Sequence, residues 1–342
     1  MTTAIQYAIT PEERQSAARG VLLGPLSILL RQKKTWSPAL LAGVVGRAVG
    51  NIARHYKIVE ILKLPEYAEL AHADPRFAFK YLTHGYLARQ LSVAERASCF
   101  VHHYQSLHDL LPRPFLRQIL RRDVTLVEIR DVGTCFAISL GFSRTHDKEG
   151  ELSLNLAVDG QTVFILSFTI VPGKVVRSQA EDVLLITRIQ GTKGCYRQIS
   201  QATKALHDVA PTALLVAALQ GAGEALGIGV LGSISGADQN SYCDECAASF
   251  KAAYDDFFTE HGVQKNEANF FLAPIPLIEK PLALVKQGHK LRTREKREFK
   301  REIANAVCRL LEESCRGNSR PLYPVRLLPA SIPEVVYASL AK

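Results

Sequence analysis

The sequence lacks the short motifs that mark two large enzyme classes. It contains no Gly-x-Ser-x-Gly elbow and no Gly-x-x-x-x-Gly-Lys-[Ser/Thr] loop, which argues against an α/β-hydrolase and a P-loop NTPase. A Gly-x-Gly-x-x-Gly string occurs at 227–232, but it follows a predicted helix and falls in a predicted strand. Dinucleotide binding needs the reverse order. We interpret these glycines as close packing of a helix on a sheet.

An uninterrupted apolar segment long enough to cross a bilayer is also missing. The stretch 209–237 has one charged residue, Glu224, but a proline, a glutamine and six glycines divide it, whereas a spanning helix needs roughly 20 apolar residues. The first residues carry Glu12 and Glu13 and lack a basic start followed by an apolar run, so no secretory signal is expected. These absences predict a cytoplasmic protein without a transmembrane helix, with peripheral attachment to the inner membrane as an alternative.

Disulfide and metal frameworks are not indicated either. Seven cysteines are an odd number in a 342-residue chain, which is typical of thiols in a reducing compartment. Cys243 and Cys246 have the spacing of a metal knuckle, but no second such pair or His pair follows, and a structural zinc needs four ligands. His102, His103 and His108 lack the i, i+4 spacing of a helical ligand pair. We therefore predict no metal site.

The composition is that of a folded protein with a basic surface. Hydrophobic residues make up 47% and charged residues 22%, close to the globular average. The length allows two domains or one large one. A net charge of +9, from 42 basic and 33 acidic residues, favours anionic partners.

The hydrophobic pattern changes near residue 120. Residues 1–120 predict helices, whereas the residues from Val124 alternate with period two and predict strands. Two hairpins are expected, with turns at Asp131–Gly133 and Asp159–Gly160. Further elements are predicted as strands at 182–191, 228–234 and 270–272 and helices near 195–208, 212–226 and 245–260.

These elements predict an α+β fold in which an N-terminal helical region precedes a mostly antiparallel sheet with flanking helices. We divide the chain into a helical region (1–120), an α+β body with a basic C-terminal helix (121–315) and a tail (316–342).

The strand-to-helix turn at 188–194 is a candidate anion-binding loop. Free N–H groups at a helix N-terminus bind anions, and glycine lets a ligand approach the main chain. A glycine-containing turn without a ligand is the alternative. The candidate cofactor-binding residues are Arg188, Gln190, Gly191, Thr192, Lys193 and Gly194.

This loop resembles the pyrophosphate loop of GNAT-type acyltransferases, whose motif is Gln/Arg, two residues, Gly, one residue and Gly/Ala. Arg188 and Gly191 keep that spacing, while Lys193 stands at the final small position. The resemblance implies a GNAT-like body that binds acyl-coenzyme A (acyl-CoA). In such a reaction Glu151 is our candidate proton acceptor and Tyr242 could protonate the leaving thiolate. The alternatives are an exposed carboxylate at a hairpin start and an ordinary tyrosine at the rim.

A basic helix near the C-terminus is a second candidate site. Residues 286–301 hold eight basic and two acidic residues, a local charge of +6. Apolar residues at helical spacing predict that one face docks, beside a cationic stripe. The stripe predicts binding to an anionic membrane surface or a phosphate-bearing ligand, with a solvated helix face as the alternative. Nucleic acid is less favoured, because no aromatic platform accompanies the cations. The stripe consists of Lys290, Arg294, Arg297 and Arg301.

Several short segments, in order, resemble the VirK/YbjX family of bacterial proteins over roughly residues 74–305. The departures are Phe258, where the family usually has Trp, and a longer segment around Cys243–Cys246. The matching segments are Asp74-Pro75-Arg76-Phe77, Lys80-Tyr81-Leu82, Glu95-Arg96, His103-Tyr104, Glu149-Gly150-Glu151, Ile189-Gln190-Gly191, Thr203-Lys204, His207, Pro211, Leu214-Leu215, Tyr254-Asp255 and Lys290.

The family resemblance implies a role in envelope integrity, virulence or resistance to cationic antimicrobial peptides, without naming a reaction. Two hypotheses follow. The first is an acyl-CoA-dependent acyltransferase with an envelope-related acceptor. The second is a non-enzymatic accessory protein that binds an anionic membrane surface or a partner through the basic helix 286–301.

Overall fold

The computed structural model describes residues 38–143, 147–315 and 324–327. The first 15 residues, in which no secretory signal is expected, and most of the predicted tail lie outside these ranges. The helices are α2 (Pro38–Gly50), α3 (Ile52–Leu62), α4 (Pro65–Ala73), α5 (Val93–Leu110), α6 (Arg113–Arg121), α7 (Tyr196–Ala205), α8 (Pro211–Leu226), α9 (Ala247–Phe250), α10 (Phe257–Glu260) and α11 (Lys290–Cys315).

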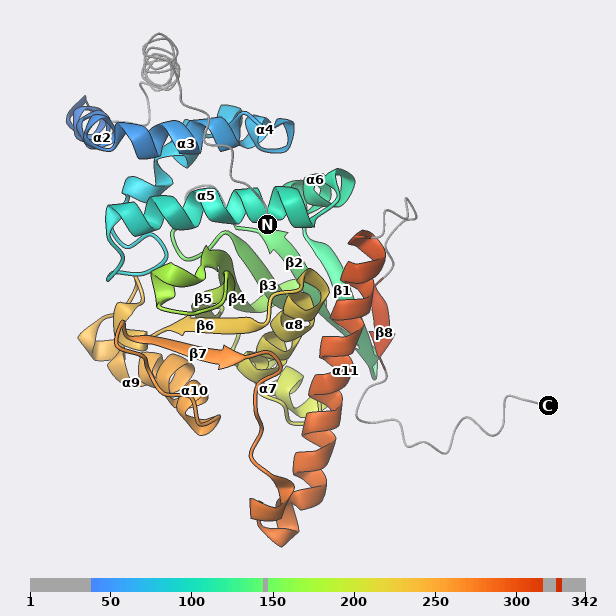
Figure 1. The fold of residues 1–342 in the computed structure, drawn as a ribbon. Helices are drawn as coiled ribbons and strands as arrows, with labels where there is room; N and C mark the ends of the chain where they lie inside the picture. Colours follow the sequence, from blue (N-terminus) through green and yellow to red (C-terminus); the bar gives the residue numbers. More distant parts are fainter. Residues whose placement is uncertain (1–37, 144–146, 316–323, 328–342) are drawn as a thin grey trace, which may run out of the picture.

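One eight-stranded sheet organises the molecule, in the order β7-β6-β5-β4-β3-β2-β1-β8 (Figure 1). Strands β1 to β5 form an antiparallel meander, β6 runs parallel to β5, and β7 is antiparallel to β6. The strands are β1 (Val124–Asp131), β2 (Thr134–Phe142), β3 (Leu152–Val158), β4 (Gln161–Pro172), β5 (Asp182–Gly191), β6 (Val230–Ile234), β7 (Phe270–Pro274) and β8 (Val325–Leu327).

The predicted fold class is confirmed, since N-terminal helices precede a mostly antiparallel sheet with flanking helices. Both hairpins form, and their turns place Gly133 and Gly160 at positive φ, a conformation that glycine adopts without strain. The predicted helix near 245–260 is α9 and α10 joined by a π-helix, η5 (Lys251–Asp256). Strand β8, which pairs parallel with β1, was not predicted.

Local sequence signals explain where the main helices begin and end. Ser92 and Glu95 form a reciprocal capping box at the start of α5. Proline at the first position of α8 costs no hydrogen bond, and Gly227 ends this helix at a φ of +70°. Helix α8 packs along α11, while α5 contacts β4 from the N-terminal helical layer (Figure 1).

The buried apolar residues of the helices and the sheet form one hydrophobic cluster. It includes Phe100 of α5, Leu166 of β4, Leu215 of α8 and Ile303 of α11, each no more than 1% exposed. Among the described residues no helix has an apolar stretch long enough to cross a bilayer.

Candidate active site

A row of small polar side chains crosses one face of the central strands. Directly paired residues of neighbouring strands lie on the same face, and alternate residues of one strand lie on opposite faces. In β3, Leu152, Leu154 and Leu156 therefore point away from this row. The register joins Ser139 and Gly141 of β2, Ser153 and Asn155 of β3, Ser167 of β4 and Arg188 of β5.

A polar cleft of about 850 Å³ opens over this row. Three carboxylates and two cations are among its lining groups, so the lining charge is slightly negative. Such a surface favours neutral or cationic ligands over anionic ones. The charged lining residues are Asp123, Asp147, Lys148, Glu149 and Arg188, and polar ones include Asn155 and Ser241.

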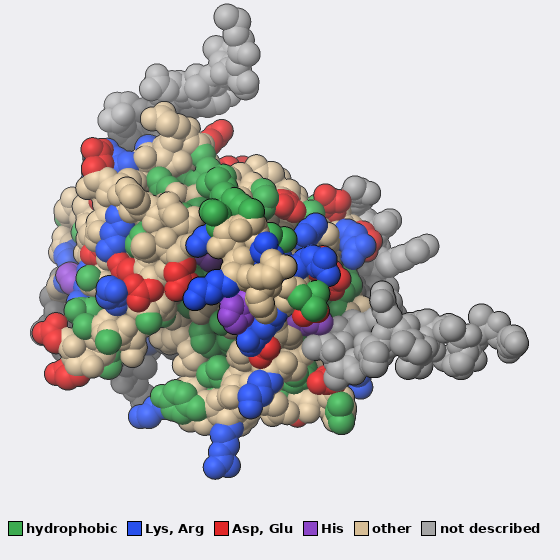
Figure 2. Space-filling model, turned by 90° about the horizontal axis from the view of Figure 1, so that it is seen from below, with side chains coloured by type: hydrophobic (Ala, Val, Ile, Leu, Met, Phe, Trp, Pro, Cys, Tyr) green, Lys and Arg blue, Asp and Glu red, His purple; other side chains and the backbone are tan. Residues whose placement is uncertain are grey.

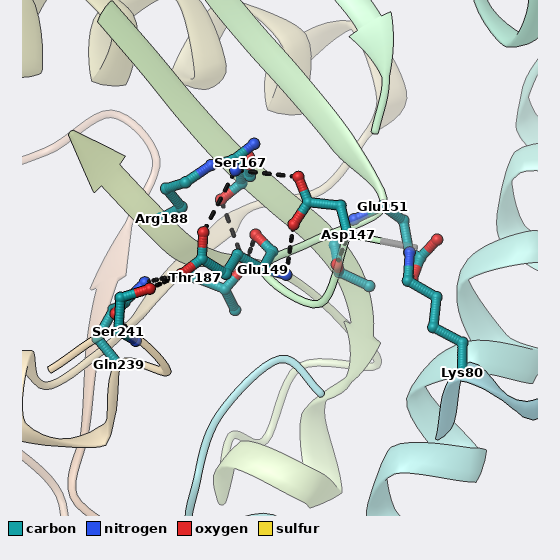
Figure 3. Close-up of polar contacts among 10 residues, drawn as sticks. Lys80, Asp147, Glu149, Glu151, Ser167, Thr187, Arg188, Gln239 and Ser241 are labelled. Carbon is teal, nitrogen blue, oxygen red and sulfur yellow. Dashed lines mark hydrogen bonds and ion pairs between the residues drawn. The ribbon is translucent and has the colours of Figure 1, made fainter. Parts of the chain in front are cut away.

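Arg188 is fixed at one side of the cleft by three contacts (Figure 3). Its Nε donates to Ser167 Oγ at 2.9 Å, and its Nη1 lies 2.9 Å from Asp147 Oδ2 and 3.2 Å from Glu149 Oε2. Its Nη2 has no hydrogen-bond partner among the described residues. The guanidinium is thus held in place with donors left for a ligand.

Glu149 is fixed from its other side by residues that follow β6. Its Oε1 accepts from Gln239 Nε2 at 2.5 Å and from Ser241 Oγ at 2.9 Å, as Figure 3 shows. Each oxygen of this carboxylate therefore has a partner, and its orientation is set before any ligand binds.

Asp123 lies toward the other side of the cleft, on the turn before β1. Asn155 Nδ2 donates to Asp123 Oδ2 at 2.9 Å. A Cβ placed on Gly141 would lie 2.1 Å from Asp123 Oδ1, so a larger residue at this position would displace the carboxylate from its place against β2. Asp123 is exposed and far less engaged than Glu149, which makes it the carboxylate best placed to accept a proton from a ligand.

Glu151 lies in the core, on the other side of the chain from Glu149 (Figure 3). The expectation of an exposed carboxylate at a hairpin start is wrong, because Glu151 is 0% exposed. Lys80 Nζ lies 2.9 Å from its Oε1, which also accepts from Tyr86 Oη, and Tyr104 Oη donates to its Oε2. A role for Glu151 as proton acceptor stays a prediction, and it is not among the residues lining the cleft.

Burial sets the ionisation of the groups around Glu151. It raises the pKa of Tyr86 and Tyr104 well above the usual value, and the charge of Glu151 adds to the effect. Burial also lowers the pKa of His103 well below its usual value, with Lys80 as a second cause. The tyrosines therefore stay protonated as donors, and His103 stays neutral, accepting a hydrogen bond from the Ile170 N–H at 3.1 Å.

The predicted loop 190–194 keeps only part of its main chain free. The Thr192 N–H donates to Val163 O at 2.8 Å, and the Cys195 N–H donates to Thr192 O at 3.1 Å. The N–H groups of Lys193 and Gly194 have no backbone partner within the described ranges. Anion binding at this loop stays a prediction that rests on these two groups.

Strands β5 and β6 separate just before this loop. They pair only between Leu184–Ile186 and Leu231–Ser233, while β5 continues along β4 to Gly191. The gap is occupied: the Ile189 N–H donates to Tyr254 Oη at 2.9 Å, and Tyr254 is 1% exposed. The space beside Ile189 is therefore filled by the protein itself.

Tyr242 and the cysteine pair lie beyond the cleft lining. The Tyr242 ring packs on Phe250, and the Arg89 guanidinium lies 5.8 Å from the ring centroid. A role for Tyr242 as the acid that protonates the leaving thiolate stays a prediction.

Cys243 and Cys246 are free thiols, and a hydrogen bond with Cys246 raises the pKa of Cys243. No group of three or more His, Cys, Asp or Glu residues in the described ranges could hold a metal ion.

Sequence reasoning missed most of this cleft. Asp123, Asp147 and Ser241 were not singled out, and Arg188 was assigned to the loop instead of the sheet face. A signal was present in β3, where Ser153 and Asn155 alternate with leucines in an otherwise apolar strand. Alternation identifies a face, but only the register shows which residues of other strands share it.

Comparison with known proteins gives a family and no function. A family model described as a protein of unknown function (DUF535) matches residues 47–307. No curated protein and no solved structure matches the chain.

Proposed function

The chain belongs to the DUF535 family, the family of the VirK/YbjX proteins, and from the geometry of its polar cleft we propose that it is a transferase for a hydroxyl- or amino-bearing acceptor. One observation carries the proposal: Arg188 and Glu149 are held in place on one side of the cleft, and Asp123 lies on the opposite side. The donor Arg188 and the acceptor Glu149 can orient a substrate by hydrogen bonds. Asp123, which has fewer partners, can remove a proton from it.

Each side of the cleft has a defined task. Asn155, which binds Asp123, lies in β3, and Arg188 lies in β5. These strands are two positions apart in the sheet, about 10 Å at the usual strand spacing. That span accommodates a sugar ring or a similar polar group. Arg188 Nη2 and Glu149 would orient the acceptor, and Asp123 would take the proton from its attacking hydroxyl or amine.

Acyl-CoA is the donor that we propose. The loop 190–194 begins two residues beyond Arg188 on the same strand, roughly 7 Å along it, and offers the Lys193 and Gly194 N–H groups to a phosphate. As the acceptor oxygen or nitrogen bonds to the thioester carbon, the C–S bond breaks and CoA leaves as a thiolate, which takes a proton from solvent. The resemblance to the VirK/YbjX family supports the proposal that this acceptor belongs to the bacterial envelope.

The donor half is tested by calorimetric titration with CoA and acetyl-CoA. We expect saturable binding that weakens at least tenfold in Gly194→Val. Gly133→Val is the matched control, because both glycines have positive φ, +86° and +84°, and open space around the Cβ position. Absence of saturable CoA binding to the wild-type protein would remove acyl-CoA as the donor.

The acceptor half is tested by CoA thiol release from acetyl-CoA in the presence of a panel of amino sugars and polyols. Asp123→Asn should lower the rate about 10²- to 10⁴-fold while CoA binding is unchanged. Asp256→Asn, which removes a surface carboxylate paired with Lys251, is the control. Equal rates in Asp123→Asn and wild type, or no release with any acceptor, would overturn the assignment.

A further inference from the structure

Arg297 of the predicted basic stripe and the neighbouring Lys300 are bound within the protein. Arg297 and Lys300 both pair with Glu279, and Arg297 also donates to Lys280 O. Arg301 lines a separate cavity of about 440 Å³ between α8 and α11. These contacts fix the segment before α11 against the helix.

The cations at the N-terminal end of α11 and in the preceding segment have few partners within the described part of the protein, unlike Arg297 and Lys300. Lys280, Lys286 and Lys290 have no ion-pair partner among the residues that the structure describes. Arg294 Nε lies 3.8 Å from Glu298 Oε1, with both side chains more than half exposed, and such pairs are weak. This part of the chain forms the lower end of the molecule (Figure 1), and Lys and Arg side chains gather around the middle of the view from below (Figure 2).

Three large aliphatic side chains are exposed within the same segment. Ile278 is 70% exposed, Leu284 65% and Leu291 59%. Leu284 belongs to the short helix η6 (Leu282–Leu284), which contacts α11, and Leu291 lies in the first turn of α11. Single exposed hydrophobic residues are ordinary, but their concentration in one segment marks an interaction surface.

We propose that this lower end, residues 278–294, docks on an anionic lipid bilayer. Ile278, Leu284 and Leu291 would enter the interfacial region, while Lys280, Lys286, Lys290 and Arg294 bind lipid phosphates. Aliphatic side chains beside cations that are unpaired or only weakly paired match the apolar interior and the anionic headgroups of such a bilayer. Nucleic acid would use the cations and leave the aliphatic groups exposed to water. The proposal is independent of the transferase reaction, because none of these residues lines the polar cleft.

Vesicle co-sedimentation tests the docking surface with the full-length protein. Vesicles of phosphatidylglycerol with phosphatidylcholine are compared with vesicles of phosphatidylcholine alone, at low and physiological ionic strength. We expect binding to the anionic vesicles only, weakened by salt. The triple variant Ile278→Ser/Leu284→Ser/Leu291→Ser and the variant Lys286→Glu/Lys290→Glu/Arg294→Glu should each bind at least tenfold more weakly.

Two control variants test whether the loss of any exposed aliphatic side chain, or of any positive charge, would weaken vesicle binding. Val132→Ser changes a 93% exposed aliphatic residue in the β1–β2 turn, and Arg122→Glu reverses an exposed charge elsewhere; both should bind like wild type. Circular dichroism checks that every variant is folded. Wild-type binding that is absent, indifferent to lipid charge, or unchanged in the serine variant would overturn the proposal. Tighter binding to an RNA or DNA oligonucleotide, lost in the charge variant alone, would do so as well.

Discussion

Gly150 shows how the backbone of a single residue separates two chemical environments. Its φ is +127°, and a Cβ there would lie 2.9 Å from Ser167 Cβ and 3.0 Å from Thr187 Oγ1. This conformation is open to glycine and strained for other residues. It lets Glu149 point toward Arg188 at the cleft while Glu151 points into the core. Neither carboxylate's environment could be predicted from its identity or its neighbours in sequence.

His55 makes stability depend on pH. It is 1% exposed, stacks on Phe79 with ring centroids 4.8 Å apart, and burial lowers its pKa to about 4. An unfolded histidine has a pKa near 6.5. Between these two values the unfolded state binds more protons than the folded state, so the free energy of unfolding decreases as the pH falls from 6.5 to about 4.

Replacing His55 with phenylalanine should keep the stacking and remove this proton uptake. We expect urea denaturation of the wild-type protein to show a loss of up to roughly 3 kcal/mol from His55 across that range, and His55→Phe to show a correspondingly flatter pH profile. His103 contributes in the same direction and is unchanged in the variant. The exposed His289→Phe is the control. Parallel profiles for His55→Phe and wild type would contradict the assignment.

At the scale of elements, the sequence predicted individual strands and turns better than it predicted which strands pair in the sheet. The Asp159–Gly160 turn and the alternating residues around it are local signals, and β3 and β4 follow them closely. The parallel pairing of β8 with β1 joins residues about 200 positions apart, and no local pattern encodes it. The cleft depends on the register of the neighbouring strands β2 to β5 and on the segment after β6 that brings Ser241 to it, and neither can be derived from the local pattern of one strand.

The packing of α8 on α11 gives an element-scale prediction. A Cβ on Gly221 would lie 2.0 Å from Ala304 O in the facing helix backbone, which has no flexible side chain to move aside. Gly221→Ala should therefore lower the free energy of unfolding by about 1–3 kcal/mol, although alanine is the better helix former. Gly46→Ala, in open space within α2, should instead raise it by about 0.5–1 kcal/mol. Equal effects in denaturant titrations would show that α8 and α11 are not in close contact.

At the scale of the whole molecule, the boundary predicted at residue 120 lies in the last turn of α6, shortly before β1 begins at Val124. The contacts do not stop there. Lys80, Tyr86 and Tyr104 come from before the boundary and bind Glu151 after it. Removing one side of a buried ion pair leaves an uncompensated charge, which costs about 3–5 kcal/mol.

We therefore predict that residues 121–315 do not fold alone. Without residues 1–120, Glu151 would lose Lys80 and both tyrosines, and β4 would lose the packing of α5. The full-length protein should show one cooperative transition by far-ultraviolet and near-ultraviolet circular dichroism. The isolated fragment should lack near-ultraviolet signal and exchange its β4 amides rapidly, and co-expression of 1–120 as a separate chain should restore protection. A fragment that unfolds cooperatively by itself would instead establish two independent domains and make the Lys80–Glu151 pair an interface between them.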